Sequence, residues 1–573
     1  MDRHDVARAL TEIASLLELT GEGASNVRAY QAAARAITHY AGDLHAARTS
    51  GALARLRGVD PRTAVVIQEL LDRGQSRMLE DLRDRVPPGL GELLEIGGLG
   101  VAKVRLIHEH LHIDSLAELE AAARDGRLAQ LPQFGPKTAE KVLRGIAFLR
   151  QTAGMLLVHH ARRDAEALMA GLAALRPVDR VALAGSMRRR CELVGDLDIV
   201  MVTAARADHV LDAVRGIPNV AEATGTAPDA LRLRLESGAA ADVYLTPPAR
   251  FGLTLLHATG SWDHLEQLAA RAAERGITWD RATLWSPAGT PPLSTEADVY
   301  RTLGLPPIPP ELREGVGEVE VAAAGGLPTL VAPGDVRGFL HCHSDYSDGT
   351  SGIAEWAEAT QAAGYAYLGI TDHSPATAFG SGLTPEDARR QHAEIDAVNT
   401  GWHDFRVLKG VEADILADGT LDYSAALRRS FDFIIASIHA RHGMSADGMT
   451  ARILHAMEDP TMTILGHPTG RLLLSRDPYP LDIDAVFARA ADRGIAIEIN
   501  ADPQRLDLDW RLLQRAHRAG VTISIGADAH GTGQLHHMDF GLGIARKGWL
   551  GAGDLLNTRP VDEFLSFAHR RRE

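Results

Sequence analysis

Hydrophobic residues recur at helical spacing over residues 1–153. In the opening segment Val6, Leu10, Ile13 and Leu17 follow one another at intervals of three or four, which is the period of an amphipathic helix. Polar residues and short turns separate this segment from others of the same kind. The pattern predicts a region built from short packed helices.

Three stretches in this region read as a helix, a glycine-bearing turn and a second helix: residues 56–63, 96–103 and 131–141. A glycine turn at a helix N-terminus exposes N–H donors that bind a backbone phosphate without reading base sequence. One copy could be an ordinary helical hairpin, whereas three in succession favour DNA binding. They look like helix-hairpin-helix motifs, whose candidate DNA contacts are Gly98, Gly100, Lys103, Gly135 and Lys137.

The hydrophobic period changes beyond residue 153. Apolar runs typical of strands cover residues 180–184, 198–202, 231–235 and 241–245. These runs predict strands, and we expect the domain to be of the α+β class.

From residue 338 onward, seven short apolar runs alternate with helical stretches. Strands that alternate with helices predict a parallel barrel, here (β/α)7-like. An alanine- and glycine-rich run before it indicates a linker, for which we expect residues 318–332. The seven runs are residues 338–340, 367–370, 407–411, 433–438, 463–465, 495–499 and 521–525.

Composition narrows the class of protein. The 573 residues are 45% hydrophobic and carry a formal charge of −15, which argues against coating nucleic acid through bulk electrostatics. Cys191 and Cys342 are the two cysteines, too few for a disulfide framework. No apolar run approaches the roughly 20 residues that span a bilayer, and residues 1–5 lack a signal-peptide core. We expect a cytoplasmic protein.

One stretch of the α+β region carries candidate chemistry. Asp196 and Asp198 open an apolar strand, and their alternate spacing aims both carboxylates at one face. Exposed aspartates often only solvate a loop, but here Gly185 and Ser186 precede them in a turn that can bind phosphate, with Arg189 to neutralise it. Paired carboxylates suit Mg²⁺ or Mn²⁺.

Residues 185–198 resemble the nucleotidyltransferase signature of family X DNA polymerases, G-S-x-R-R-x-x-E-x-x-G-D-[IVLM]-D, at every fixed position. The resemblance implies that Asp196, Asp198 and Asp242 are the catalytic carboxylates and bind two metal ions. It further implies that the nucleotide is bound by Gly185, Ser186, Arg189, Gly195, Thr259, Gly260 and Ser261.

The resemblance extends along the chain. Residues 26–33 resemble a segment of the amino-terminal domain in bacterial members, which binds the 5′-phosphate side of a gap. The implied domains are a helical DNA-binding domain (1–85), helix-hairpin-helix fingers (86–153), a palm (154–250), a thumb (251–317), the linker (318–332) and the barrel (333–573).

Nine imidazole and carboxylate side chains stand at or just beyond the ends of the predicted barrel strands, with one in the first loop. Active sites of such barrels gather at that rim, and nine ligands exceed what one or two ions need. A cluster of three zinc or manganese ions fits, and iron is left open. The nine are His341, His343, Asp348, His373, Glu412, His439, His467, Asp528 and His530. The set resembles the PHP phosphoesterase domain.

Together these resemblances imply a bacterial family X DNA polymerase with a carboxyl-terminal PHP domain. The implied function is filling of short gaps during DNA repair, with 3′-5′ exonuclease or 3′-end processing in the barrel. Its partners would be gapped or nicked double-stranded DNA and dNTPs, and the protein would act as a monomer at the nucleoid. Two alternatives remain open: a nuclease or 3′-phosphatase whose palm only positions DNA, and a non-catalytic DNA-end clamp.

The nucleotide pocket departs from the family pattern. An aromatic pair is usual before Thr259, where this chain has His257 and Ala258. Trp262 and Leu265 replace a usual lysine and asparagine. The missing ring leaves space beside the sugar, so weak dNTP binding, weak exclusion of the 2′-hydroxyl and a reliance on Mn²⁺ are predicted. The alternative is that Trp262 refills this space from another direction.

Overall fold

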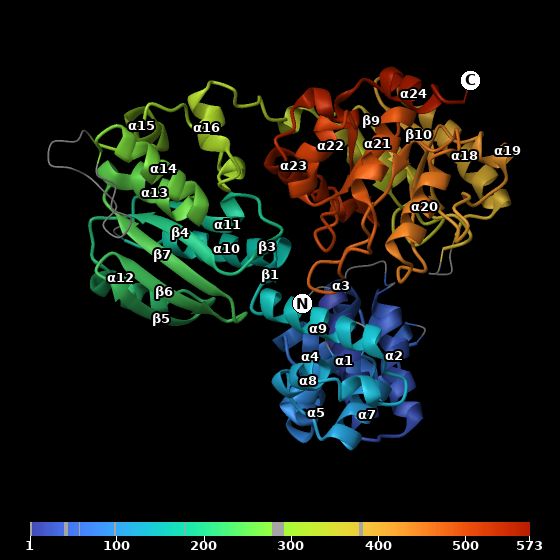
Figure 1. Ribbon diagram of the computed structural model, residues 1–573, viewed down its shortest axis with the longest axis horizontal. Helices are drawn as coiled ribbons and strands as arrows, with labels where there is room; N and C mark the ends of the chain where they lie inside the picture. The colour runs from blue at the N-terminus through green and yellow to red at the C-terminus, as the bar shows by residue number, and fades with distance from the viewer. Residues whose placement is uncertain are drawn as a thin grey trace. The chain divides into compact units, whose positions relative to one another are not determined.

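The computed structural model describes residues 3–38, 40, 44–56, 58–94, 96, 99–176, 178–277, 292–377 and 382–572. The chain divides into two compact units. The first comprises residues 1–153 with 474–476, and the second comprises residues 154–473 with 477–573 (Figure 1). Each unit is described by itself.

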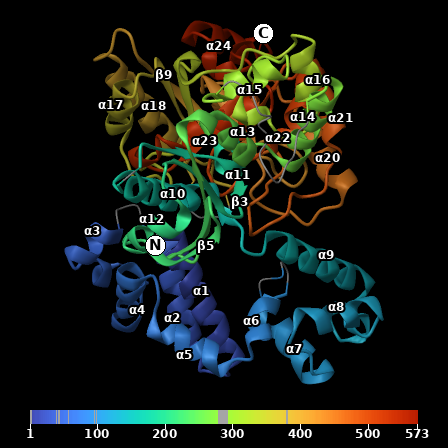
Figure 2. The same cartoon turned by 90° about the vertical axis from the view of Figure 1, so that its left-hand side faces the viewer.

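The first unit is helical (Figure 2). Its apolar faces share one hydrophobic cluster that includes Leu10, Ile13, Val104 and Val142. Its α-helices are α1 (Arg3–Leu19), α2 (Ala24–Thr38), α3 (Leu44–Thr49), α4 (Pro61–Arg73), α5 (Arg77–Arg85), α6 (Pro88–Leu94), α7 (Val101–Leu111), α8 (Leu116–Arg124) and α9 (Pro136–Thr152). Two 3₁₀ turns, η1 (Ala52–Arg55) and η2 (Leu128–Gln130), precede α4 and α9.

The palm holds a five-stranded sheet in the order β2-β4-β7-β6-β5, in which β4 and β7 are parallel and the other pairs antiparallel. The strands are β2 (Arg180–Leu183), β4 (Leu197–Val202), β5 (Val220–Ala227), β6 (Ala230–Leu235) and β7 (Ala240–Thr246). A short ribbon pairs β1 (Leu156–Leu157) with β3 (Leu193–Val194). Two longer helices, α10 (Val158–Ala173) and α12 (Ala207–Arg215), and the four-residue α11 (Gly185–Arg188) complete the domain.

The edge strand β5 was not predicted. Six of its eight residues are exposed, so its sequence lacks the apolar alternation that marks a half-buried strand.

The thumb is helical and has its own core. Its helices are α13 (Phe251–Thr259), α14 (Trp262–Glu274), α15 (Glu296–Thr302) and α16 (Glu318–Ala323). α16 covers the first part of the predicted linker, because Val319 and Ala322 are buried in the thumb core. The irregular connection to the barrel is therefore shorter than residues 318–332.

The barrel is closed by seven parallel strands in the order β8-β9-β10-β11-β12-β13-β14, which confirms the predicted fold class. The strands are β8 (Gly338–Cys342), β9 (Tyr367–Ile370), β10 (Arg406–Asp414), β11 (Phe433–Ser437), β12 (Ile464–Leu465), β13 (Ala496–Asn500) and β14 (Ile523–Ala529). The helices of the barrel domain are α17 (Ile353–Ala362), α18 (Pro385–Asn399), α19 (Ala425–Arg428), α20 (Ala446–Ala456), α21 (Ile483–Arg493), α22 (Trp510–Arg518), α23 (His537–Lys547) and α24 (Val561–His569).

The palm and the barrel belong to one continuous hydrophobic core, which contains both Leu168 of α10 and Ile544 of α23. Buried and half-buried ion pairs cross the same boundary. Arg190 Nη1 lies 2.9 Å from Asp539 Oδ2, and Arg471 Nη2 lies 3.3 Å from Glu192 Oε1. Within the described part of the chain, no helix combines the length and apolarity needed to cross a membrane.

Candidate active sites

The three palm carboxylates come together on neighbouring strands. Parallel pairing of β4 with β7 places Asp198 directly beside Asp242, and Asp196 immediately precedes β4. Arg232 of β6 joins the group: its Nη1 lies 3.3 Å from Asp196 Oδ2 and forms an ion pair with Asp242. The predicted face is therefore formed, with an arginine that the sequence did not single out.

The electrostatics of this group favour a cation. Burial, followed by the negative charge of Asp196, raises the pKa of Asp198 to about 7. Burial also raises the pKa of Asp242, although Arg232 opposes the shift. The Tyr244 hydroxyl donates a 3.2 Å hydrogen bond to Asp198 Oδ1. A divalent ion would compensate the carboxylates better than one shared arginine, so the donor set fits Mg²⁺ or Mn²⁺.

The glycine-serine turn stands against Asp198. Gly185 has φ +61°, and a Cβ at that position would lie 1.9 Å from Asp198 Oδ2. Only glycine combines this left-handed backbone with so close an approach. The Ser186 Oγ is buried and has no hydrogen-bond partner among the described residues. A buried hydroxyl without a partner fits a site that a ligand oxygen completes.

The other candidate nucleotide contacts are engaged by neighbouring protein groups or lie in the turns between elements. Arg189 donates from Nε to Glu314 Oε1 at 2.8 Å and from Nη1 to the Thr259 carbonyl at 2.7 Å, so carboxylate and carbonyl oxygens already engage its guanidinium. Ser261 caps α14, accepting a hydrogen bond from the His264 N–H. Gly260 links α13 to that cap, and Gly195 lies in the turn before Asp196.

The helix-hairpin-helix candidates differ at their helix starts. The Asp60 carboxylate accepts hydrogen bonds from the N–H groups of Arg62 and Thr63, so its own side chain caps α4. Gly100 precedes α7 and Gly135 precedes α9, and neither helix start has a side-chain cap in the described structure. Their N–H groups suit phosphate oxygens.

The two candidate lysines lie in the first turns of these helices. Lys103 belongs to α7 and Lys137 to α9. Lys103 Nζ lies 5.8 Å from the centre of the Phe134 ring. Gly98 lies outside the described residues.

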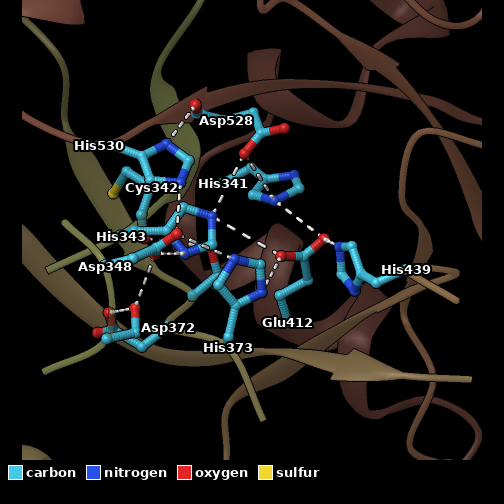
Figure 3. Close-up of polar contacts among 12 residues, drawn as sticks. His341, Cys342, His343, Asp348, Asp372, His373, Glu412, His439, Asp528 and His530 are labelled. Carbon is cyan, nitrogen blue, oxygen red and sulfur yellow. Dashed lines mark hydrogen bonds and ion pairs between the residues drawn. The ribbon is translucent and has the colours of Figure 1, made fainter. Parts of the chain in front are cut away.

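All nine histidine and carboxylate candidates of the barrel face one centre. Figure 3 labels all of them except His467. Glu412 of β10 lies in the middle. Its Oε1 is 3.0 Å from His467 Nε2 and 3.2 Å from His439 Nε2, and its Oε2 is 2.9 Å from His373 Nδ1. The side chains that the strand-end pattern singled out therefore lie together in the structure.

The remaining ligand candidates surround His343. His343 Nε2 lies 3.4 Å from Asp528 Oδ1, and its Nδ1 lies 3.7 Å from Asp348 Oδ1. His530 Nε2 is 3.2 Å from Asp348 Oδ2, while His341 Nε2 is 3.4 Å from Glu412 Oε1. Asp348 links the first loop to this cluster.

Residues behind the ligands were missed by sequence reasoning. Glu498 Oε1 lies 2.6 Å from His341 Nδ1, and its Oε2 accepts from the His467 N–H at 2.7 Å. Asp414 Oδ1 is 3.0 Å from His439 Nδ1. Such contacts fix the orientation of an imidazole ligand. The only sequence signal was a polar residue inside an apolar strand, as Glu498 is inside β13.

The donor set of the barrel fits metal ions. His341 Nε2, both ring nitrogens of His343 and Glu412 Oε2 are buried without a hydrogen-bond partner in the described structure. Three overlapping groups have ligand atoms that all lie within 4.8 Å of one another. They are His343, Asp348, His373 and His530; His341, His343 and Asp528; and His373, Glu412 and His439.

Comparison with known families assigns most of the chain. Matches are to the DNA polymerase beta thumb at residues 254–314, the PHP domain at 340–502, a helix-hairpin-helix domain at 1–76 and a SAM-like helix-hairpin-helix tandem at 90–147. These ranges contain the hairpins and most of the nine barrel candidates.

Two kinds of relative stand out among curated proteins. A protein of Bacillus subtilis (strain 168) named "DNA polymerase/3'-5' exonuclease PolX" is 35% identical over 575 residues, which covers 100% of both chains. Proteins named "probable phosphatase" match a smaller part. The one from Syntrophotalea carbinolica is 30% identical over 207 residues, 33% of this chain and 79% of its own. The one from Clostridium acetobutylicum is 36% identical over 138 residues, 22% of this chain and 54% of its own.

Proposed function

Because the chain belongs to the PolX family of DNA polymerases with 3′-5′ exonuclease activity, we propose that it fills short gaps in damaged DNA and trims 3′ ends. The palm would add nucleotides and the barrel would remove them. The observation that carries this proposal is the convergence of Asp196, Asp198 and Asp242 on one sheet face beside the glycine-serine turn, in a chain that matches its PolX relative from end to end.

In the palm, Asp196, Asp198 and Asp242 would hold two divalent ions, Mg²⁺ or Mn²⁺. Bound there, such ions neutralise phosphate charge and favour ionisation of the primer 3′-hydroxyl. Ser186 Oγ and the first N–H groups of α11 would bind the β- and γ-phosphates, with Arg189 beside them. Asp242 would orient the 3′-hydroxyl and accept its proton, with Arg232 released from the carboxylate.

In the barrel, the nine ligand candidates would hold three zinc or manganese ions. Ions there activate water and neutralise the oxygens of a phosphodiester. Glu498 and Asp414 would keep His341 and His439 oriented with a lone pair toward the centre. A 3′ end entering this rim would lose its terminal nucleotide.

The helical unit would hold the DNA. N–H groups at the starts of α7 and α9 are the proposed phosphate contacts, with Lys103 and Lys137 adding charge nearby. The proposed partners are gapped or nicked double-stranded DNA and dNTPs. We also propose that the protein works as a monomer in the cytoplasm, at the nucleoid, where this substrate lies.

One variant in each site tests whether the palm extends primers and the barrel degrades 3′ ends. Asp198→Ala should abolish primer extension on gapped DNA and leave degradation of 3′-labelled single strands unchanged, because it removes a palm ligand only. His343→Ala should do the opposite. Asp212→Ala, on the exposed face of α12, and the exposed barrel variant His403→Ala are the matched controls.

Undiminished extension by Asp198→Ala would refute the palm assignment and favour the reading in which the palm only positions DNA. Both activities surviving in both variants would favour the DNA-end clamp. Metal analysis of His343→Ala and of the unaltered protein, after reconstitution with Mn²⁺ or Zn²⁺, should show a lower metal content in the variant.

A second activity is favoured by one observation. The barrel region is shared with proteins named "probable phosphatase", one of which is 30% identical over 207 residues. Removal of a 3′-phosphate from a primer would use the same ligands. Release of inorganic phosphate from a 3′-phosphorylated primer, lost in His343→Ala, would establish it.

A further inference from the structure

A lysine of the barrel domain reaches the proposed nucleotide site of the palm. Lys547 ends α23, and only 1% of its side chain is exposed. Its Nζ donates a 3.1 Å hydrogen bond to the Arg189 carbonyl and forms an ion pair with Glu314. Glu314 is the same carboxylate that binds Arg189 Nε at 2.8 Å. Two cations from different domains therefore share one carboxylate.

The charges of this buried cluster do not cancel. Burial would raise the pKa of Glu314, but Lys547 and then Arg189 outweigh it and hold the pKa below its usual value, so Glu314 is ionised. Cys191 Sγ lies 3.5 Å from Glu314 Oε1, and burial raises the pKa of that thiol, which stays neutral. Among Arg189, Lys547 and Glu314, two positive charges therefore stand against one negative charge.

Removing Lys547 would change that balance. Glu314 and Arg189 would then neutralise each other, and the carboxylate would compete fully with phosphate for the guanidinium. The backbone of Arg189 would also lose the contact that fixes its carbonyl. The guanidinium beside Thr259 would offer less positive potential to a triphosphate.

We propose that Lys547 is a positioning residue of the polymerase site: it shares Glu314 and so keeps Arg189 in place, with its positive charge only partly neutralised, for the nucleotide triphosphate. The inference rests on the proposed phosphate-binding role of Arg189. It makes the barrel domain part of the palm's nucleotide affinity, separately from the barrel's own chemistry.

Steady-state extension on gapped DNA tests the proposal in the full-length protein. Lys547→Met should raise KM for dNTP about three- to tenfold with little change in kcat, since it weakens binding of the triphosphate without touching the carboxylates. Exonuclease activity on a 3′-labelled single strand should be unchanged. Lys547→Arg should restore KM, because it returns the charge.

Two further variants separate charge from folding. Glu314→Gln combined with Lys547→Met returns the cluster to +1, so KM should fall back towards that of the unaltered enzyme. Arg546→Met removes the neighbouring cation, whose Nε lies 2.7 Å from Glu311 Oε1, and should leave KM unchanged. An equal rise in KM for Arg546→Met, or no recovery in the double variant, would overturn the electrostatic role.

Arg189→Gln separates the role of Lys547 from the phosphate-binding role of Arg189. A rise in KM for Arg189→Gln without one for Lys547→Met rejects the role of Lys547 alone. An unchanged KM for Arg189→Gln rejects the phosphate-binding role on which it rests.

Discussion

Glu296 is the carboxylate that ties the thumb to the palm. Arg188 donates to both of its oxygens, at 2.7 Å each, and Arg313 Nη2 donates at 3.2 Å. Burial would raise the pKa of Glu296, but hydrogen bonds from Arg188 and Arg313 outweigh it and lower the pKa to about 2, from 4.5. A carboxyl with a depressed folded pKa stabilises the fold fully above its unfolded pKa. That stability is lost as pH falls from about 4.5 towards 2.

This shift corresponds to about 3 kcal/mol of folding free energy at neutral pH. Glu296→Gln should therefore lower the free energy of unfolding by roughly that amount at pH 7, and the difference from the unaltered protein should shrink as the pH falls below 4.5. Urea unfolding between pH 7 and pH 3 measures it. Glu274→Gln, exposed on α14, is the control. A deficit independent of pH would contradict the ion-pair account.

The sugar side of the nucleotide pocket has residues unlike those of the family. Leu265 is buried in the thumb core, and Trp262 is 62% exposed at the start of α14. Leu265 supplies no amide, and the exposed Trp262 does not fill the space left by the ring missing at positions 257–258, so we predict weak exclusion of ribose. Single-turnover incorporation should favour dNTP over rNTP by about tenfold or less. Strong preference for deoxyribose with tight dNTP binding in Mg²⁺ would contradict the prediction.

Single residues show where sequence reasoning succeeds. The metal-ligand candidates were predictable because they stand at strand ends, where a barrel must bring them together. The pairing of Arg189 with Glu314 was not, because it joins positions far apart in the chain through side-chain geometry alone. Arg232 was also missed, because the pairing of β6 with β7 is what brings it beside Asp242.

At the scale of elements, the turn that carries α11 is set by backbone shape. Gly185→Ala would add a Cβ 1.9 Å from Asp198 Oδ2 at φ +61°. The left-handed backbone alone costs an alanine about 1 kcal/mol. Displacing a metal-binding carboxylate by an ångström can cost about a hundredfold in rate.

We therefore expect Gly185→Ala to lower kcat for extension by about a hundredfold or more and to leave exonuclease activity intact. Gly225→Ala in β5 of the same sheet is the matched control, because its Cβ would meet nothing within 4 Å. Equal activity of the two variants would show that the close approach has no role in extension.

The sequence predicts those strands whose buried residues form apolar runs, and it misses strands that are mostly exposed. The seven barrel strands and the palm strands β2, β4, β6 and β7 follow from apolar runs, and all are present. The exposed edge strand β5 gave no such signal. In the first hairpin, the Asp60 carboxylate occupies N–H groups of α4 that a phosphate would otherwise take.

At the scale of the whole molecule, the division into two compact units predicts how the protein unfolds. Calorimetry of the metal-free protein should show two transitions, one for each unit. Saturation with Mn²⁺ or Zn²⁺ should raise only the transition temperature of the second unit, residues 154–473 with 477–573, because the described candidate metal-ligand groups lie there. The expected gain is about 2.7 kcal/mol at a metal concentration a hundredfold above Kd.

His343→Ala should reduce that upward shift, while His403→Ala should not. Metal that raised both transitions equally in all three proteins would show that the binding is not specific to the barrel site.

The continuous core between palm and barrel has a consequence for inheritance. A gene cut short before the barrel would not encode a smaller polymerase. It would encode a palm and thumb without the barrel's share of that core, and Arg190 and Glu314 would lose their ion-pair partners Asp539 and Lys547. Synthesis and degradation of DNA are therefore inherited together, and selection acts on both at once. A lineage can silence the barrel by single substitutions far more readily than it can delete it.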